Sequence, residues 1–136
     1  MLSLTEGDPM KRDMDLVRNI LFAVEGSDEP LDTDFLDFGE HTPEEVSYHV
    51  RMLTAHGLLD SHDDGDYGSP DRIIIDGLTW QGCDYLDAVR DARVWEKTKE
   101  TVKKAVGSTT MSVIKDTAVK VASKLIDIEI FSVLEQ

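Results

Sequence analysis

The chain has 136 residues, of which 40% are hydrophobic, so it is large enough for one small domain with an appended element. Its formal net charge of −14 favours a protein that nucleic acid and anionic lipid repel. A single cysteine, Cys83, excludes an internal disulfide framework, and no apolar run approaches the ~20 residues needed to span a bilayer.

Residues 1–9 lack the basic start and the apolar stretch of a signal peptide, so we expect a flexible leader and a cytoplasmic protein. Apolar residues then recur at three- and four-residue steps, which predicts a helix from Met10 to about Glu25. Its apolar stripe consists of Met14, Val17, Leu21 and Val24. Residues 27–41 are acidic and irregular, and they allow a short helix, a turn or a short strand.

The next helix has a strong predicted start at Thr42. The threonine is a capping residue, Pro43 suits the first helical position, and Glu45 completes a capping box. The helix should end at Gly57. Three apolar side chains should face the core, namely Val46, Val50 and Leu53.

A hairpin should follow this helix. Leu58 and Leu59 enter a strand, residues 60–71 are rich in turn formers, and residues 72–75 read as the returning strand. Thr79 should cap a helix that continues, with or without a kink, through Trp95 to Val106. Its apolar positions include Trp80, Cys83, Leu86 and Val89. On this stripe, Cys83 is interpreted as a buried small apolar residue and not as a nucleophile.

Gly107 should end that helix, and Ser108 and Thr109 can cap a last one. One face of the last helix carries Met111, Ile114, Ala118, Val121, Ala122 and Leu125. The residues from Ile126 to Phe131 alternate as a strand would, yet they can also extend the helix, and periodicity leaves both alternatives open.

Two motifs carry a resemblance. The run from Val46 to Leu59, Val-Ser-Tyr-His-Val-Arg-Met-Leu-Thr-Ala-His-Gly-Leu-Leu, resembles the recognition helix and strand entry of the ArsR and MarR winged-helix regulators. The run Leu78-Thr79-Trp80-Gln81-Gly82 resembles the Leu-Thr-x-x-Gly that leads from the wing to the next helix in MarR-like proteins. Together the two motifs imply a winged helix.

A closer likeness extends from Met10 to about Ala122. Its elements are Met10 to Arg18, Val46 to His49, Leu78 to Gly82, Leu86 to Asp91, and Trp95. They resemble the bacterial and phage-borne family catalogued as domain of unknown function 2513. This likeness implies a winged-helix fold and a setting in bacterial or mobile-element genomes, such as those of phages, and it implies no particular activity. We therefore expect an α+β fold, with a winged helix-turn-helix-like domain over 10–91 and a C-terminal helical extension over 92–136.

The exposed face of the helix at 43–56 is the candidate recognition face. We assign to it Glu44, Ser47, Tyr48 and Arg51, with Arg72 from the returning strand. Ser, Tyr and Arg side chains bond bases or phosphates, but affinity for duplex DNA depends mainly on phosphate neutralisation. Residues 1–92 hold 6 Lys/Arg against 22 Asp/Glu, a net charge of −16.

The wing is acidic as well, with Asp60, Asp63, Asp64, Asp66 and Asp71. We therefore predict a non-enzymatic interaction or regulatory module that works mainly through protein contacts. A DNA-binding transcriptional regulator is the alternative, and an acidic DNA-mimic inhibitor is a further one.

Histidines raise the question of a metal. The four are His41, His49, His56 and His62. A metal site needs three or four convergent ligands, and His49 fits packing in the core better. The run from Asp60 to Asp71 only loosely echoes a calcium loop. Since there is also no Gly-rich phosphate loop and no Ser-His-Asp order, we expect no metal, no cofactor and no enzyme activity.

Residues 93–124 reverse the charge, with 8 Lys/Arg against 3 Asp/Glu. We expect the apolar stripe of the last helix to mediate self-association in a homodimer, and packing within the same chain is the alternative. The stripe consists of Met111, Ile114, Ala118, Val121 and Leu125.

Overall fold

The structure is a computed structural model that describes residues 11–63, 68, 70–104 and 110–134, with side chains up to Glu129. Within these residues the fold is α+β, as predicted, with five α-helices and one small antiparallel sheet. The chain divides into two compact units on either side of the Cys83–Asp84 bond. The expected leader, the helix end at Gly107 and the cap at Ser108 and Thr109 lie outside the described residues.

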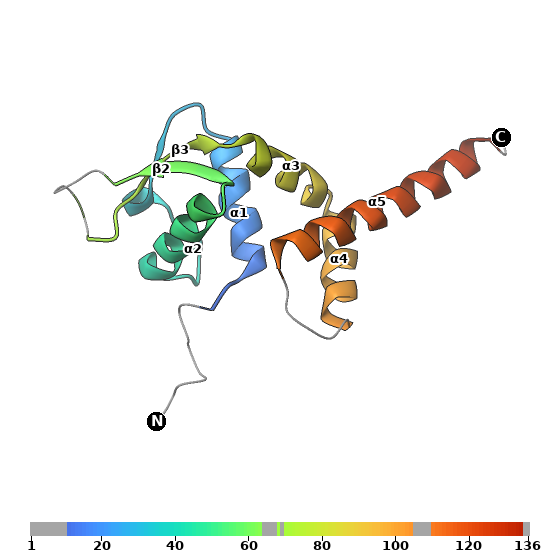
Figure 1. The fold of residues 1–136 in the computed structure, drawn as a ribbon, viewed down its shortest axis with the longest axis horizontal. Coiled ribbons are helices and arrows are strands. Elements are labelled where there is room, and N and C mark those ends of the chain that lie inside the picture. Colours follow the sequence, from blue (N-terminus) through green and yellow to red (C-terminus); the bar gives the residue numbers. More distant parts are fainter. Residues whose placement is uncertain (1–10, 64–67, 69, 105–109, 135–136) are drawn as a thin grey trace, which may run out of the picture. The chain divides into compact units, whose positions relative to one another are not determined.

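Helix α1 spans Met14–Glu25 (Figure 1). It begins at Met14 because the Asp13 side chain caps it, accepting hydrogen bonds from the backbone N–H groups of Asp15 and Leu16. The apolar stripe is confirmed, since Val17, Leu21 and Val24 are buried together with Leu16 and Ile20.

The acidic segment after α1 contains both a short strand and a short helix. Strand β1 is Leu31–Asp32, and the 3-10 helix η1 is Thr33–Phe35. The Asp32 side chain caps η1 by accepting the N–H of Asp34 at 2.9 Å. Residues so rich in aspartate favour local caps over a long helix.

Helix α2, Pro43–Ala55, has the predicted capping box. The Thr42 hydroxyl accepts the N–H of Glu45, and the Glu45 carboxylate accepts the N–H of Thr42. Beyond the helix end, Gly57 adopts a φ of 82°, a left-handed conformation that glycine tolerates better than other residues.

The hairpin consists of β2, Leu59–His62, and β3, Ile74–Leu78. The sheet has the order β1-β3-β2, all antiparallel, with Leu59 opposite Leu78 and Leu31 opposite Ile75. Helix α1 packs against β3, and α2 packs against β2 and α1. The element order α1-β1-η1-α2-β2-β3 is compatible with a winged-helix-like arrangement.

The two sequence motifs meet at one joint, where α2, β2 and α3 come together. The backbone N–H of Thr79 donates to the carbonyl of Leu58 at 3.1 Å, and the Thr79 hydroxyl donates to the carbonyl of Gly57. The same hydroxyl accepts the N–H of Gly82 at 2.9 Å and so caps α3, as predicted. A Cβ on Gly82 would overlap the Leu58 carbonyl oxygen, which explains why glycine stands there.

The predicted long helix after Thr79 is interrupted. Helix α3 is Trp80–Val89 and α4 is Ala92–Lys104. The break occurs because the Asp91 carboxylate accepts the N–H groups of Arg93 and Val94 and starts a new helix. Leu86 and Val89 are buried as expected, and Trp95 of α4 is buried too.

Two predictions on the first turn of α3 are wrong. Cys83 is exposed, and Trp80 is 83% exposed, so neither belongs to the core. The buried apolar side chains of α3 begin with Tyr85 and Leu86, whereas the first turn contacts the rest of the unit through the Thr79 joint and Gly82.

Helix α5 runs without a break over Met111–Leu134 and begins at a Thr110 cap, whose hydroxyl accepts the N–H of Val113. The residues from Ile126 are thus helical, and the strand alternative is wrong. In the second unit, α4 packs against α5. No helix within the described residues has both the length and the apolar character needed to cross a membrane.

Candidate interaction surfaces

The candidate recognition face is only partly available on the surface of α2. Glu44 and Arg51 are exposed and Tyr48 is half-buried. Ser47, in contrast, is buried, which corrects its assignment to the exposed face. Its hydroxyl donates to the backbone carbonyl of Asp71 at 2.8 Å and so ties α2 to the segment that enters β3.

The two arginines of this face contact carboxylates of their own chain. Arg51 pairs with the Asp71 side chain at 3.6 Å. Arg72 Nε donates to Asp32 Oδ2 at 2.8 Å, and an Nη lies 2.7 Å from the same oxygen. Asp34 lies 3.9 Å from the Arg72 Nε. The positive charges therefore face aspartates of the first unit.

The Arg72 contact also changes the acidity of Asp32. The hydrogen bond from the guanidinium lowers the pKa of this carboxyl below its ordinary value of 3.8. Both side chains are mostly buried between β1 and the entry to β3. The pair therefore joins two segments that lie 40 residues apart in the chain.

We expect Arg72→Gln to lower the free energy of unfolding by about 1.5 kcal/mol at pH 7, because a charged hydrogen bond to Asp32 is lost. A carboxyl whose folded pKa is depressed stabilises the fold above its unfolded pKa and loses that contribution as the pH falls through the folded pKa. The difference between wild type and variant should therefore begin to shrink near the ordinary pKa of 3.8 and disappear only below the lowered folded pKa of Asp32. Urea unfolding from pH 7 to pH 2 measures this.

Arg93→Gln is the control for that experiment, because its pair with Asp91 is exposed to solvent and contributes little. A pH-independent loss in Arg72→Gln would contradict the prediction and assign the effect to packing of the arginine stem.

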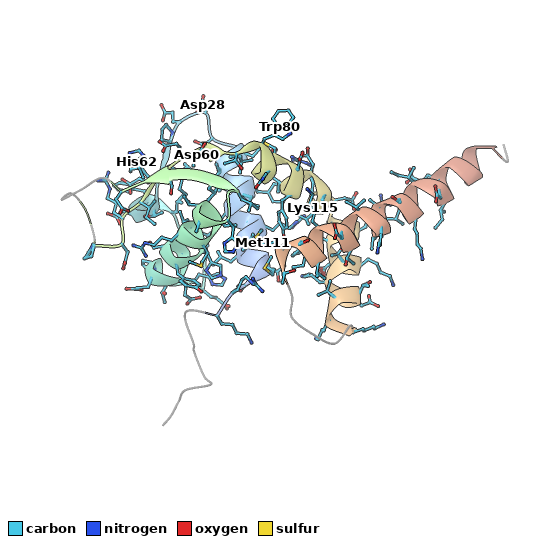
Figure 2. All side chains as sticks on the ribbon, in the orientation of Figure 1. Asp28, Asp60, His62, Trp80, Met111 and Lys115 are labelled. Carbon is cyan, nitrogen blue, oxygen red and sulfur yellow. The ribbon has the colours of Figure 1, made fainter. Side chains whose placement is uncertain are left out.

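Each of the four histidines has a hydrogen-bond partner. His41 lies between two carboxylates, with Nδ1 2.9 Å from Glu45 Oε2 and Nε2 3.5 Å from Asp13 Oδ2. The hydrogen bond from His41, followed by the backbone bond from Thr42, lowers the pKa of Glu45. His62 contacts Asp76 at 2.8 Å on the exposed hairpin (Figure 2). His56 contacts the carbonyl of Met52.

His49 is buried and joins α1 to α2. Its Nε2 accepts the backbone N–H of Asp13 at 2.9 Å, and its Nδ1 lies 2.7 Å from the Glu45 carbonyl. Because one ring nitrogen accepts an N–H, the ring proton must be on Nδ1, which donates to Glu45. No group of three or more His, Cys, Asp or Glu that could hold a metal is found in the described part of the chain.

The negative charge is concentrated before the Cys83–Asp84 boundary. The sequence up to Cys83 holds 5 Lys/Arg and 19 Asp/Glu, a net charge of −14, whereas the sequence from Asp84 holds 9 of each. Exposed carboxylates occur on the loop after α1 and on β2, as Asp28 and Asp60 show in Figure 2. The whole net charge of the protein thus belongs to the first unit.

We use the name α5 seam for the apolar residues that recur at three- and four-residue steps along α5. They are Met111, Ile114, Ala118, Val121, Leu125 and Ile128. Ile114 and Ala118 are buried, and Met111, Val121 and Leu125 are half-buried. Ile128, absent from the predicted stripe, is 64% exposed. The sequence left a strand and a helix open for residues 126–131, and alternation over six residues hides a helical period, so Ile128 was not assigned to the stripe.

The comparisons with known proteins identify relatives without a described activity. Residues 11–109 match the family described as "Hypothetical protein (DUF2513)". An "Uncharacterized protein" of Haemophilus influenzae is 34% identical over 123 residues, which covers 86% of this chain and 99% of that protein. No solved structure matches the chain. Helix α5 begins after the last residue of the family match.

Proposed function

The chain belongs to the DUF2513 family, and we propose that it is a non-enzymatic winged-helix module acting mainly through protein–protein contacts. The winged helix is supported by the sheet order β1-β3-β2 and by the position of α2 before the hairpin. In this arrangement α2 is the recognition helix, and the segment between β2 and β3 is the wing.

The observation that carries the proposal is the pairing of the arginines on that face. DNA affinity depends on cations that neutralise phosphates. Arg51 contacts Asp71, and Arg72 contacts Asp32 and Asp34, so each would have to leave a carboxylate before it could bind phosphate. The net charge of −14 on the first unit opposes a polyanion further.

Uncharged hydrogen-bonding groups do not compensate. Ser47 is buried and already bonded to the Asp71 carbonyl, so it is not available to a base edge. Glu44 and Tyr48 remain on the face. A carboxylate beside a half-buried tyrosine suits a protein partner better, because aromatic side chains are enriched at protein interfaces and a carboxylate repels phosphate.

We expect no sequence-specific binding of duplex DNA at micromolar protein in about 150 mM salt, because the acidic surface outweighs two paired arginines. Fluorescence anisotropy with labelled duplexes, including the DNA upstream of the protein's own gene, measures this. The variants Arg51→Ala and Arg72→Ala should leave the baseline unchanged.

A specific shift at nanomolar protein, weakened by Arg51→Ala, would contradict the proposal and establish the DNA-binding regulator. A second experiment replaces Glu44 with a photo-crosslinking amino acid in cells, in order to identify what this face contacts. Protein adducts are expected there, and nucleic-acid adducts would contradict the proposal. The same amino acid at Asp116, on the exposed polar face of α5, is the control.

A further inference from the structure

We propose that a second copy of this chain covers the C-terminal half of the α5 seam, in a parallel helix pair. The inference deepens the proposed function, since it names one of the protein contacts. It uses only residues of the second unit.

The spacing of the seam is that of a coiled coil. Met111, Ala118 and Leu125 occupy a positions, and Ile114, Val121 and Ile128 occupy d positions. This pattern covers residues 111–128 of an unbroken helix of 24 residues. A strict heptad repeat keeps one stripe turned toward a partner helix along the whole length of such a pair.

Among the described residues, α4 is long enough to cover only part of this seam. At 1.5 Å per residue, the 13 residues of α4 extend about 20 Å and the 24 residues of α5 about 36 Å. Burial follows this difference, because Ala118 is fully buried whereas Ile128 is 64% exposed. Figure 1 shows α5 continuing well past α4.

The open end of the seam is the exposed apolar surface that needs an occupant, because Ile128 there is 64% exposed. Val119 and Ile126 are exposed too, at b positions outside the seam. An apolar surface that remains uncovered in this way marks a contact with another macromolecule. A partner that covers this surface therefore needs an apolar helix face of similar length, and α5 of another copy has such a face.

Charged residues beside the seam favour a second copy as the partner and a parallel orientation of the two helices. Lys124 is at a g position, and Glu129 is at the e position of the following heptad. In a parallel pair, Lys124 of each copy faces Glu129 of the other, which gives two attractive contacts. In an antiparallel pair, g positions face g positions and e positions face e positions, so Lys124 cannot pair with Glu129 of the other copy. No ion pair involving Lys124 or Glu129 is found among the described side chains.

The experiment measures the mass of the full-length chain by sedimentation velocity, from about 1 to 100 µM in about 150 mM salt, which screens repulsion between the acidic first units. We expect the mass of a dimer, as a parallel helix pair of two copies requires, and a larger assembly would overturn the pair. Ile128→Asp should raise the dissociation constant about a hundredfold, since two apolar side chains lose their burial.

Val113→Asp is the matched control, because Val113 is also exposed on α5 but lies on the side away from the seam. It should leave both the mass and the helical circular dichroism of wild type unchanged. Equal helicity in Ile128→Asp shows that this variant is folded.

A charge exchange tests the parallel direction. Lys124→Glu alone should raise the dissociation constant roughly tenfold, and the double variant Lys124→Glu with Glu129→Lys should restore it. Failure of the double variant to restore association would overturn the parallel pair.

A wild-type chain that stays monomeric at 100 µM would overturn the second copy as occupant, and so would equal dissociation by Val113→Asp and Ile128→Asp. These outcomes are independent of the DNA measurement. If the protein is a dimer that binds DNA specifically, the proposed function is contradicted and the helix pair is not. If it is a monomer that binds no DNA, only the helix pair is contradicted.

Discussion

Gly82→Ala should lower the free energy of unfolding by about 3 kcal/mol, which corresponds to a fall in Tm of roughly 10 °C or more. The reason is a backbone contact. The added Cβ would overlap the carbonyl oxygen of Leu58, and a backbone atom cannot move away as a flexible side chain can. That carbonyl also accepts the N–H of Thr79, so any shift would break the joint between β2 and α3.

Gly77→Ala is the matched control for this substitution. Gly77 lies on the neighbouring strand β3, and a Cβ there would meet no atom within 4 Å. We expect its effect to stay within about 0.5 kcal/mol. Urea unfolding followed by circular dichroism gives both values. Equal stabilities of the two variants would show that the joint can relax and would contradict the prediction.

His49→Ala should lower the free energy of unfolding by about 2–3 kcal/mol, because it leaves a cavity and removes two hydrogen bonds at once. The imidazole is buried and connects the backbone N–H of Asp13, at the start of α1, to the carbonyl of Glu45 in α2. Without it, the start of α1 loses its hydrogen-bonded link to α2, and the Asp13 N–H needs water as a partner.

His56→Ala is the control, because His56 lies on the same chain segment but is exposed and contacts only the Met52 carbonyl of its own helix. Its cost should be within about 0.5 kcal/mol. Thermal unfolding at pH 7.5, where the unperturbed imidazole is neutral, compares the two. If both variants melt at the same temperature, His49 is not the link between α1 and α2.

The local features were predictable because short-range chemistry determines them. The capping box at Thr42 and the helix end at Gly57 follow from residue types a few positions apart, and the structure agrees with both, since α2 ends at Ala55 just before this glycine. The same holds for the Thr79 cap and for the apolar stripe of α1.

The wrong predictions for Ser47 and Cys83 concern residues whose burial depends on contacts with other segments of the chain. Ser47 was assigned to an exposed face, yet the carbonyl of Asp71, 24 residues away, buries its hydroxyl. Cys83 was assigned to the core, but the joint at Gly82 turns the first turn of α3 outward. The periodicity of the sequence cannot predict either effect, because it does not show which backbone segments approach these residues or how closely they do so.

The α+β class, the order of α2, the hairpin and α3, and the position of the acidic charge follow from the sequence alone, because these depend on residue type and spacing. Only the tertiary structure decided that Arg51 and Arg72 face aspartates, that two distant motifs meet at Thr79, and that the α5 seam is covered at Ile114 and open at Ile128. Those properties depend on which segments approach each other in space. The periodicity of a sequence does not record contacts between residues that lie far apart in the chain.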